Sequence, residues 1–167
     1  MRGTYTMMIR NVAFLLATVA AGVPAAHAQN GNAQMQIDAV VKSINGGDIG
    51  GVEIFGVPPN VAFRVNVTPE RLESWWDYKL IVRGLSLESE KLRVALSSTT
   101  IQPYSAKLDS LDVRTGIVFY SKTPEGKRIA SLYFDRNGGH GAVNKMPVSF
   151  GPDLLPRLKK AVHAPIE

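Results

Sequence analysis

Apolar and polar residues alternate in short runs over the second half of the chain, and glycine, proline and asparagine separate these runs. Alternation with a period of two is typical of strands that bury one face. The separators TPEG (123–126) and NGG (137–139) contain the residues that favour tight hairpin turns. The predicted strands are 112–122, 127–136, 140–144 and 148–150.

The first half of the chain is less regular. Residues 52–57 and 61–67 both alternate, and Pro-Pro-Asn between them predicts a hairpin. Residues 37–44 fit either a short helix or a strand, and the β-branched pair Val40 and Val41 favours the strand. The segment before it, 29–36, is small and polar and is predicted to be loose.

Thr68-Pro69-Glu70 is a helix-start signal. Threonine can cap free backbone amides, proline fits the first helical turn, and glutamate suits the positive end of the helix dipole. We predict a short helix from 69 to about 75 and a strand over 77–83. The spacing of Leu72, Trp75, Trp76 and Leu80 also fits one longer helix, so the sequence leaves residues 76–83 open between the two.

Two further helices are predicted from apolar periodicity and capping residues. The first covers 86–99, with Ser86 as its cap, and the second follows Gly151-Pro152-Asp153. Residues 100–111 between them read as a loop. The expected inward faces are Leu92, Ala95 and Leu96 in the first helix, and Leu154, Leu155, Leu158 and Val162 in the second.

Together these elements predict an α+β fold of two layers. Runs of strands joined by tight turns imply an antiparallel β-sheet of meanders and hairpins, and the two or three helices are expected to pack on one face of it. A single α+β domain is expected over 37–163. The core candidates are Trp75 or Trp76, Ile117, Phe119, Phe134 and Leu158.

The first 28 residues have the pattern of a cleaved secretory signal peptide. Arg2 and Arg10 supply positive charge ahead of the apolar run VAFLLATVAAGV (12–23), and Ala26-His27-Ala28 is the small-x-small motif of a cleavage site. A run of this length is too short to span a bilayer, which needs roughly 20 residues. The sequence therefore predicts cleavage after Ala28 and a periplasmic or secreted protein, with no transmembrane helix in the mature chain; the true start is open among Met1, Met7 and Met8.

Composition excludes several kinds of chemistry. The chain has no cysteine, which removes thiol nucleophiles, Cys-ligated zinc and iron–sulfur clusters. Of the 19 Lys and Arg residues, two lie in the signal segment, which leaves 17 against 14 acidic residues and a net charge of +3. These basic residues are scattered rather than gathered in a stripe, so no nucleic-acid partner is expected.

The stretch YFDRNGGHGAVN (133–144) collects the most chemically suggestive residues. Asn137-Gly138 favours a hairpin turn, and glycine at 139 and 141 allows a bulge or a close approach of two backbones. Asp135 could instead orient His140 as a general base, or the two could share a metal ion, but each of these sites needs further residues. We interpret the stretch as a hairpin.

No other segment carries a recognisable catalytic or cofactor motif. NGGDIGG (45–51) lacks the spacing of a phosphate-binding loop and is interpreted as a turn. No catalytic residue, metal ligand or cofactor is therefore predicted. A hydrolase that uses two carboxylates leaves no linear signature, so it stays open among Asp48, Glu53, Glu70, Glu73, Asp77, Glu88, Glu90, Asp109, Asp112 and Asp135.

The sequence favours an exported, non-enzymatic protein that binds another macromolecule, most simply a protein in the cell envelope or outside the cell. Such a protein could serve as an inhibitor, an immunity-type protein or an envelope accessory. The alternatives are a carrier of a small apolar ligand and a carboxylate-based hydrolase of envelope polysaccharide. The predicted binding residues lie at hairpin tips and on an uncovered sheet face: Tyr120, Tyr133, Asp135, Asn137, His140 and Trp76.

Overall fold

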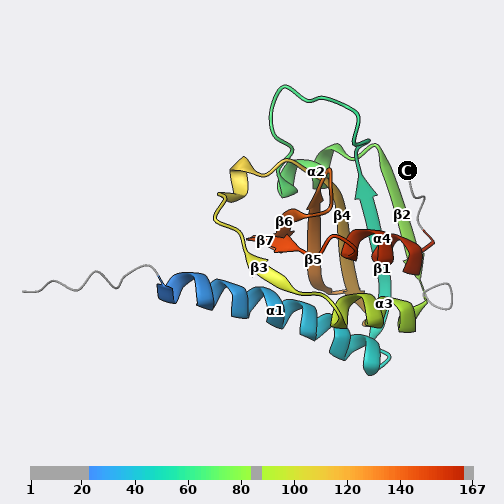
Figure 1. Ribbon diagram of the computed structural model, residues 1–167. Helices are drawn as coiled ribbons and strands as arrows, with labels where there is room; N and C mark the ends of the chain where they lie inside the picture. The colour runs from blue at the N-terminus through green and yellow to red at the C-terminus, as the bar shows by residue number, and fades with distance from the viewer. Residues whose placement is uncertain (1–22, 84–87, 164–167) are drawn as a thin grey trace, which may run out of the picture.

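The computed structural model describes residues 23–83 and 88–163. They form a seven-stranded antiparallel sheet with four α-helices packed on it, which confirms the predicted α+β class. The strands lie in the order β2-β1-β4-β5-β6-β7-β3 (Figure 1). Their bounds are β1 Ile49–Gly56, β2 Tyr78–Arg83, β3 Ile101–Pro103, β4 Val113–Ser121, β5 Arg128–Asp135, β6 His140–Val143 and β7 Met146–Phe150.

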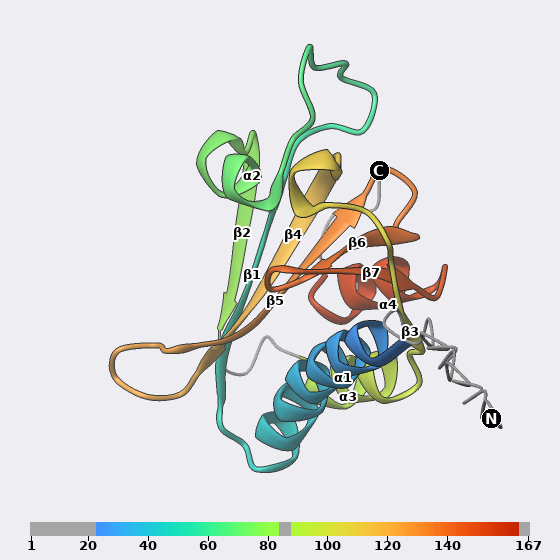
Figure 2. The ribbon, with the colours of Figure 1, turned by 90° about the vertical axis from the view of Figure 1, so that its left-hand side faces the viewer.

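Three helices cover one face of the sheet, and the fourth lies on the other. Figure 2 shows α1 (Val23–Asn45), α3 (Ser89–Ser97) and α4 (Leu154–Ala161) on one side, and α2 (Pro69–Trp75) on the opposite side. The main core fills the space between the three helices and the sheet. It contains the predicted core residues Ile117, Phe119, Phe134 and Leu158, all fully buried, together with the predicted inward faces of α3 and α4.

The prediction of a loose segment at 29–36 and the preference for a strand at 37–44 are both wrong, because α1 runs through both segments. Ala33, Ile37, Val40 and Ile44 recur at spacings of three and four residues, and all four are buried against the sheet. The burial of this stripe outweighs the strand preference of Val40 and Val41. All four residues lie after Ala28, so removal of the first 28 residues, which stays a prediction, would leave this stripe intact.

The predicted hairpin of 52–67 is also wrong in its second half. Residues 52–56 belong to β1, but 57–68 form a loop with no strand. Both edges of β1 are already paired, one with β2 and the other with β4, so no place remains beside it for 61–67. Val67 is nevertheless buried, because the end of the loop packs on the sheet.

The helix-then-strand prediction for 69–83 is confirmed by α2 and β2. Thr68 caps α2 by accepting a hydrogen bond from the Arg71 amide at 3.4 Å. The accompanying prediction of a tryptophan in the core is wrong, because Trp75 is 50% and Trp76 is 42% exposed. Pro69 and Leu72 are the buried residues of this short helix, and Leu72 belongs to the second apolar cluster. The predicted cap Ser86 lies outside the described residues.

Residues 100–111 contain more structure than the predicted loop. Ile101–Pro103 form the short edge strand β3, paired with β7, and Leu108–Ser110 form one turn of 3₁₀ helix. A strand of three residues carries too little alternation to be recognised in sequence.

The close backbone approach predicted in the 137–141 turn region is found at Gly141. A Cβ built on Gly141 would lie 1.7 Å from the Tyr133 carbonyl oxygen, a contact that no side chain can make. Gly139, two residues earlier, has nothing within 4 Å of the same position.

We therefore expect Gly141→Ala to destabilise the protein by about 3 kcal/mol or more, because β5 and β6 must move apart to admit the methyl group. Gly139→Ala is the matched control and should change the free energy of unfolding by less than about 0.5 kcal/mol. Denaturant unfolding of both variants measures the difference. Equal stabilities would contradict the close packing of β5 on β6.

Candidate functional site

The sheet face opposite α1, α3 and α4, which we name the open face, is only partly covered. A second apolar cluster lies under α2, the 57–68 loop and the 3₁₀ turn. It consists of Phe55, Val57, Val67, Leu72, Leu111, Val113, Val118, Tyr133 and Ala142. Beyond this cluster the open face presents polar and charged side chains from β1, β2, β4 and β5.

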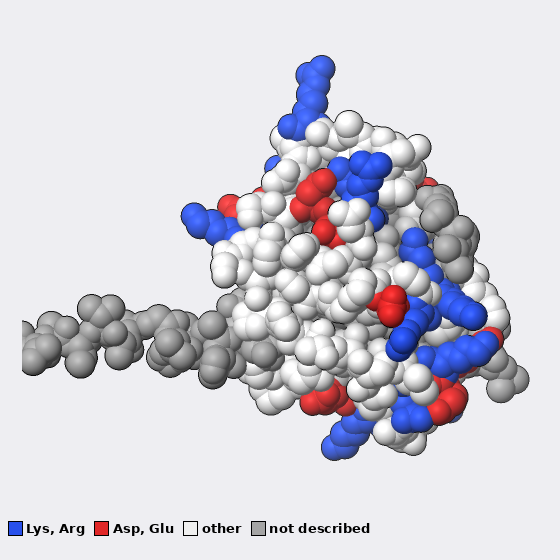
Figure 3. Space-filling model, in the orientation of Figure 1, with Lys and Arg blue, Asp and Glu red and all other residues white. Residues whose placement is uncertain are grey.

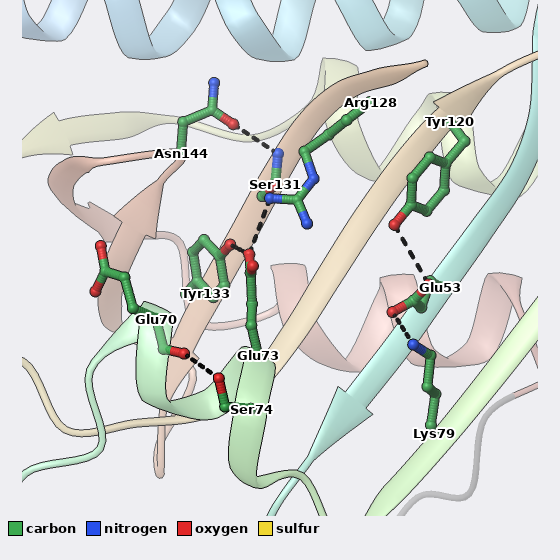
Figure 4. A network of polar contacts seen from close by, with 10 residues as sticks. All are labelled: Glu53, Glu70, Glu73, Ser74, Lys79, Tyr120, Arg128, Ser131, Tyr133 and Asn144. Carbon is green, nitrogen blue, oxygen red and sulfur yellow. Dashed lines mark hydrogen bonds and ion pairs between the residues drawn. The ribbon is translucent and has the colours of Figure 1, made fainter. Parts of the chain in front are cut away.

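These polar side chains form a continuous row across four strands and α2, which we name the polar row (Figure 4). Lys79 on β2 pairs with Glu53 on β1 at 2.7 Å, and the Tyr120 hydroxyl on β4 donates to Glu53 at 3.3 Å. Arg128 on β5 lies opposite Tyr120 in the strand register and pairs with Glu73 of α2 at 2.9 Å. Glu53 thus receives one partner from each of the two strands beside β1.

Glu73 is the point where α2 is joined to the sheet. It accepts hydrogen bonds from the buried Tyr133 hydroxyl and from Arg128, both on β5. Partial burial pulls the pKa of Glu73 upward, but these two hydrogen bonds and the Arg128 charge outweigh it, so the pKa is lowered. Burial, and then the bond to Glu73, raise the pKa of Tyr133 far above its ordinary range. The pair is therefore an ionised carboxylate held by a neutral phenol.

Tyr120 has a similar environment at the next strand. Burial, followed by the charge of Glu53, raises the pKa of its phenol. Both tyrosines of the polar row therefore stay protonated at neutral pH and act as hydrogen-bond donors to glutamate.

Arg114 on β4 fixes the 57–68 loop over the open face. Its side chain is 9% exposed, donates to the Val61 carbonyl at 2.8 Å and pairs with Asp112 at 2.7 Å. The guanidinium also lies 4.9 Å from the centre of the Phe63 ring. Asp112 in turn accepts a hydrogen bond from the Val67 amide at 3.0 Å. One buried cation therefore holds the middle of the loop, and its acidic partner holds the loop's end.

Large apolar side chains are exposed next to the polar row. Trp76 contacts Lys79, whose Nζ lies 5.3 Å from the ring centre, and Arg71 lies 5.6 Å from the Trp75 ring. Ile81 on β2 is 48% exposed. It shares a face with Lys79 and Arg83, because the alternate residues Leu80 and Val82 pack into the main core. The open face thus combines aromatic, aliphatic and charged groups.

Two surface hollows flank the polar row. The first, of about 480 Å³, lies between β1, β2 and the β4–β5 turn and includes Glu53, Ile81, Arg83 and Tyr120 among its lining. The second, of about 430 Å³, lies between α2, β5 and the β6–β7 turn. It is lined by Pro69, Glu70, Glu73, Arg128, Ile129, Ser131, Tyr133, Asn144 and Lys145.

The structure divides the six predicted binding residues between the polar row and the β5–β6 turn, and Tyr133, two residues before Asp135 on β5, lies between the two groups. Tyr120 and Tyr133 belong to the polar row, and Trp76 lies beside it. Asp135, Asn137 and His140 lie at the β5–β6 turn, at the other end of β5 from Arg128, roughly 23 Å away at the rise of an extended strand.

At the β5–β6 turn, Asp135 and His140 do come together. His140 Nδ1 lies 3.4 Å from the Asp135 carboxylate, and the His140 ring contacts the Tyr104 ring with centroids 4.5 Å apart. Asp135 also accepts a hydrogen bond from the Gly139 amide at 3.0 Å, which closes the turn. These contacts support the hairpin interpretation of the stretch.

Sequence reasoning missed the partners that complete the polar row. Glu53 and Glu73 are two of ten candidate carboxylates in the sequence, and no motif distinguishes Lys79 or Arg128. The alternation of Lys79, Ile81 and Arg83 in β2 is the one signal that an exposed, mixed-charge face was present. The pairing itself depends on strand order, which the sequence does not give.

The helix side of the molecule carries basic residues over α3 and α4 (Figure 3). Several of them are matched by acidic neighbours on the same helix or at its N-cap, with Lys91 paired to Glu88, Arg93 to Glu90 and Arg157 to Asp153. Within residues 23–83 and 88–163, no three potential metal ligands come together, and no helix has the length and apolarity to span a membrane.

Comparison with known proteins adds no further information on the site, since no family model, curated protein sequence or solved structure matches the chain.

The hydrogen bonds that join Glu73 of α2 to Tyr133 and Arg128 of β5 lead to a prediction about the pH dependence of stability. Glu73→Gln should lower the free energy of unfolding by about 1 kcal/mol at pH 7, because the charge-assisted bonds from Tyr133 and Arg128 are weakened. The pKa of Glu73 is lower in the folded protein than its ordinary value of 4.5, so this stabilisation is present above pH 4.5 and is lost as the pH falls through the folded-state pKa. Denaturant unfolding at pH 7 and well below pH 4.5 measures the effect.

Glu70→Gln is the matched control, because Glu70 lies one turn earlier on α2 and makes no ion pair within the described residues. It should cost only a few tenths of a kcal/mol at either pH. A Glu73→Gln deficit that persists unchanged in acid would contradict the assignment of an ionised Glu73.

The contacts of Arg114 lead to a prediction about the stability of the 57–68 loop. Arg114→Met should destabilise the protein by about 2 kcal/mol, because it removes a bond to a carbonyl and leaves Asp112 without its cation. Hydrogen exchange should become faster at the Val67 amide, which Asp112 holds. Arg64→Met, on the same loop but exposed and without an ion pair among the described residues, should leave both measurements unchanged; an equal effect of the two variants would refute the role of Arg114.

Proposed function

We propose that this protein is an exported, non-enzymatic binding protein. It binds another macromolecule, most simply a protein, on its open face. The proposal of export is supported by the signal-peptide pattern of the first 28 residues. The proposal of binding is supported by the open face itself, and above all by Trp75, Trp76 and Ile81, three large apolar side chains exposed on the only side of the sheet that the three core helices leave uncovered.

The chemistry of the open face suits a protein partner. Interfaces between proteins are enriched in tryptophan, tyrosine and arginine, and their energy is concentrated in a few such side chains surrounded by polar groups. The open face has this composition: two tryptophans and Ile81 beside a row of paired charges and tyrosine hydroxyls.

The polar row gives the partner a fixed pattern of charge. Lys79, Glu53, Arg128 and Glu73 are held by one another and by two tyrosines, so their positions are set before a partner arrives. Binding then requires little ordering of side chains, and preorganisation of this kind increases affinity. The same pairing favours a partner whose charges alternate in a complementary way.

The alternative of an apolar-ligand carrier is less well supported by this geometry. Both hollows beside the polar row are lined largely by charged and hydroxyl-bearing residues. A hydrolase is also less well supported, because the carboxylates Glu53 and Glu73 already serve as acceptors in a structural network.

Site-specific photocrosslinking in the producing cell tests the proposal. A photoreactive amino acid at Ile81, on the open face, should give a crosslinked adduct of defined mass with a partner protein. The same residue at Val94, which is 45% exposed on α3 at the opposite side of the molecule, should give none. Adducts of equal yield from both positions, or an adduct from position 94 alone, would refute the assignment of the open face.

Substitution refines the same test. Ile81→Glu should weaken binding of the captured partner by about 2 kcal/mol, because it places an unpaired charge in the apolar part of the interface. Val94→Glu introduces the same charge on a similarly exposed side chain of the helix side and should leave the affinity unchanged.

A further inference from the structure

The two edge strands of the sheet differ in how well they are protected against pairing with a further strand. At one edge, β3 has only three residues and ends in Pro103. Short length and proline both hinder the addition of a strand. At the other edge, β2 has six residues, no proline and a continuous register, and it pairs with β1 alone among the described strands (Figure 1). The β2 edge is therefore the one that can accept another strand.

The backbone groups of β2 alternate between β1 and the outer edge. The Val57 amide bonds to β4, so the alternation along β1 directs the backbone groups of Ile54 towards β2. Ile54 lies opposite Leu80 in the register, so Leu80 bonds to β1. The neighbouring residues Lys79 and Ile81 then direct their N–H and C=O groups outward, where a further strand would bond to them.

The side chains of β2 leave this edge open to pairing. Lysine commonly protects an exposed edge, but Lys79 pairs with Glu53 at 2.7 Å and so directs its charge towards β1 (Figure 4). Ile81 is 48% exposed, and Leu80 is only half-buried although it packs on the main core. A strand that pairs with β2 would remove part of this apolar surface from water.

Two exposed charges of opposite sign lie at the two ends of β2. Asp77 directly precedes the strand and Arg83 is its last residue, and neither makes an ion pair within residues 23–83 and 88–163. When two copies of one strand pair in antiparallel fashion, the start of each lies beside the end of the other. The charges of β2 are therefore complementary to those of a second β2.

The alternation of faces and the charges together select one register for such a pair. Residues opposite each other must point to the same face of the sheet, so a two-fold axis has to pass through a residue position. An axis at Leu80 pairs residues 78–82 of the two copies, and an axis at Ile81 pairs residues 79–83. The axis at Leu80 places Asp77 opposite Arg83. The axis at Ile81 places Lys79 opposite Arg83, and like charges in this position are destabilising.

We propose that β2 pairs with the β2 strand of a second copy of this chain, about a two-fold axis at Leu80, so that the two sheets become one. Ion pairs between Asp77 and Arg83 close both ends of the junction, and the two Leu80 side chains meet at its centre. The two copies use the same surface, as a two-fold interface requires. This dimer forms without the macromolecular partner, and a photocrosslink from Ile81 to a second copy is recognised by its mass, twice that of the chain.

Light scattering during gel filtration tests for the dimer, and charge reversal tests its register. The purified protein should elute with twice the mass of the chain. Asp77→Lys and Arg83→Asp should each raise the dissociation constant at least about tenfold, because each places like charges opposite one another twice. The double variant restores opposite charges and should restore the dimer. Asp109→Lys, which reverses an exposed charge on the 3₁₀ turn, should leave the dissociation constant unchanged.

Engineered cysteines test the same register, because the chain has no cysteine of its own. At an axis through Leu80, the two Leu80 Cα atoms lie about 4.5 Å apart, a distance that a disulfide spans. Leu80→Cys should therefore give a disulfide-linked dimer on mild oxidation, whereas Val94→Cys on α3 should stay monomeric. A mixture of Lys79→Cys and Ile81→Cys should link across the junction and leaves the core side of β2 unchanged.

A protein that stays monomeric up to millimolar concentration would overturn the proposal. A dimer that is unaffected by either charge reversal, or that the double variant does not restore, would refute the β2 register. A disulfide from Ile81→Cys alone that forms faster than one from Leu80→Cys would refute it as well. Slow hydrogen exchange of the Ile81 amide in dilute, monomeric protein would show that this edge is already covered within one chain, and it would also overturn the proposal.

Discussion

The Glu73 carboxylate joins helix α2 to the sheet on the open face. A seven-stranded sheet has two faces to satisfy, and the three helices α1, α3 and α4 cover only one of them. The short helix α2 buries only Pro69 and Leu72, which is little apolar surface to hold it on the sheet by burial alone. Its charge-assisted bonds from Tyr133 and Arg128 supply what the helix lacks, and they also fix one end of the polar row.

The remaining features of the open face are consistent with the small apolar surface that its covering elements bury. Arg114 holds the 57–68 loop through polar bonds in the same way that Glu73 holds α2. Both covering elements are attached in part by polar groups, and Trp75, Trp76 and Ile81 beside them are exposed. The helix side has the opposite character, with a continuous apolar core under three amphipathic helices. The helix side therefore buries the larger apolar core, and the open face leaves aromatic, aliphatic and charged side chains exposed.

The sequence predicted the parts of this fold whose signals are local. Turn residues located the hairpins from β4 to β7, and Thr68-Pro69-Glu70 located the start of α2. The predictions that failed concern partners distant in sequence: α1 is a helix because the sheet buries its stripe, and 61–67 is a loop because both edges of β1 are occupied. The polar row belongs to this second kind. Residue type alone makes Tyr120, Tyr133 and Trp76 candidates for binding. The roles of Glu53 and Glu73 depend on the tertiary arrangement that brings them beside those tyrosines.

The account requires that the open face be uncovered in the free protein, and the only two tryptophans of the chain report on it directly. Acrylamide quenching of tryptophan fluorescence, measured on the purified protein, is therefore the most direct test. We expect long-wavelength emission and efficient quenching, because both indoles are about half exposed beside the polar row. Short-wavelength emission with protection from acrylamide would place the tryptophans in a core and would contradict the account of the open face as a binding surface.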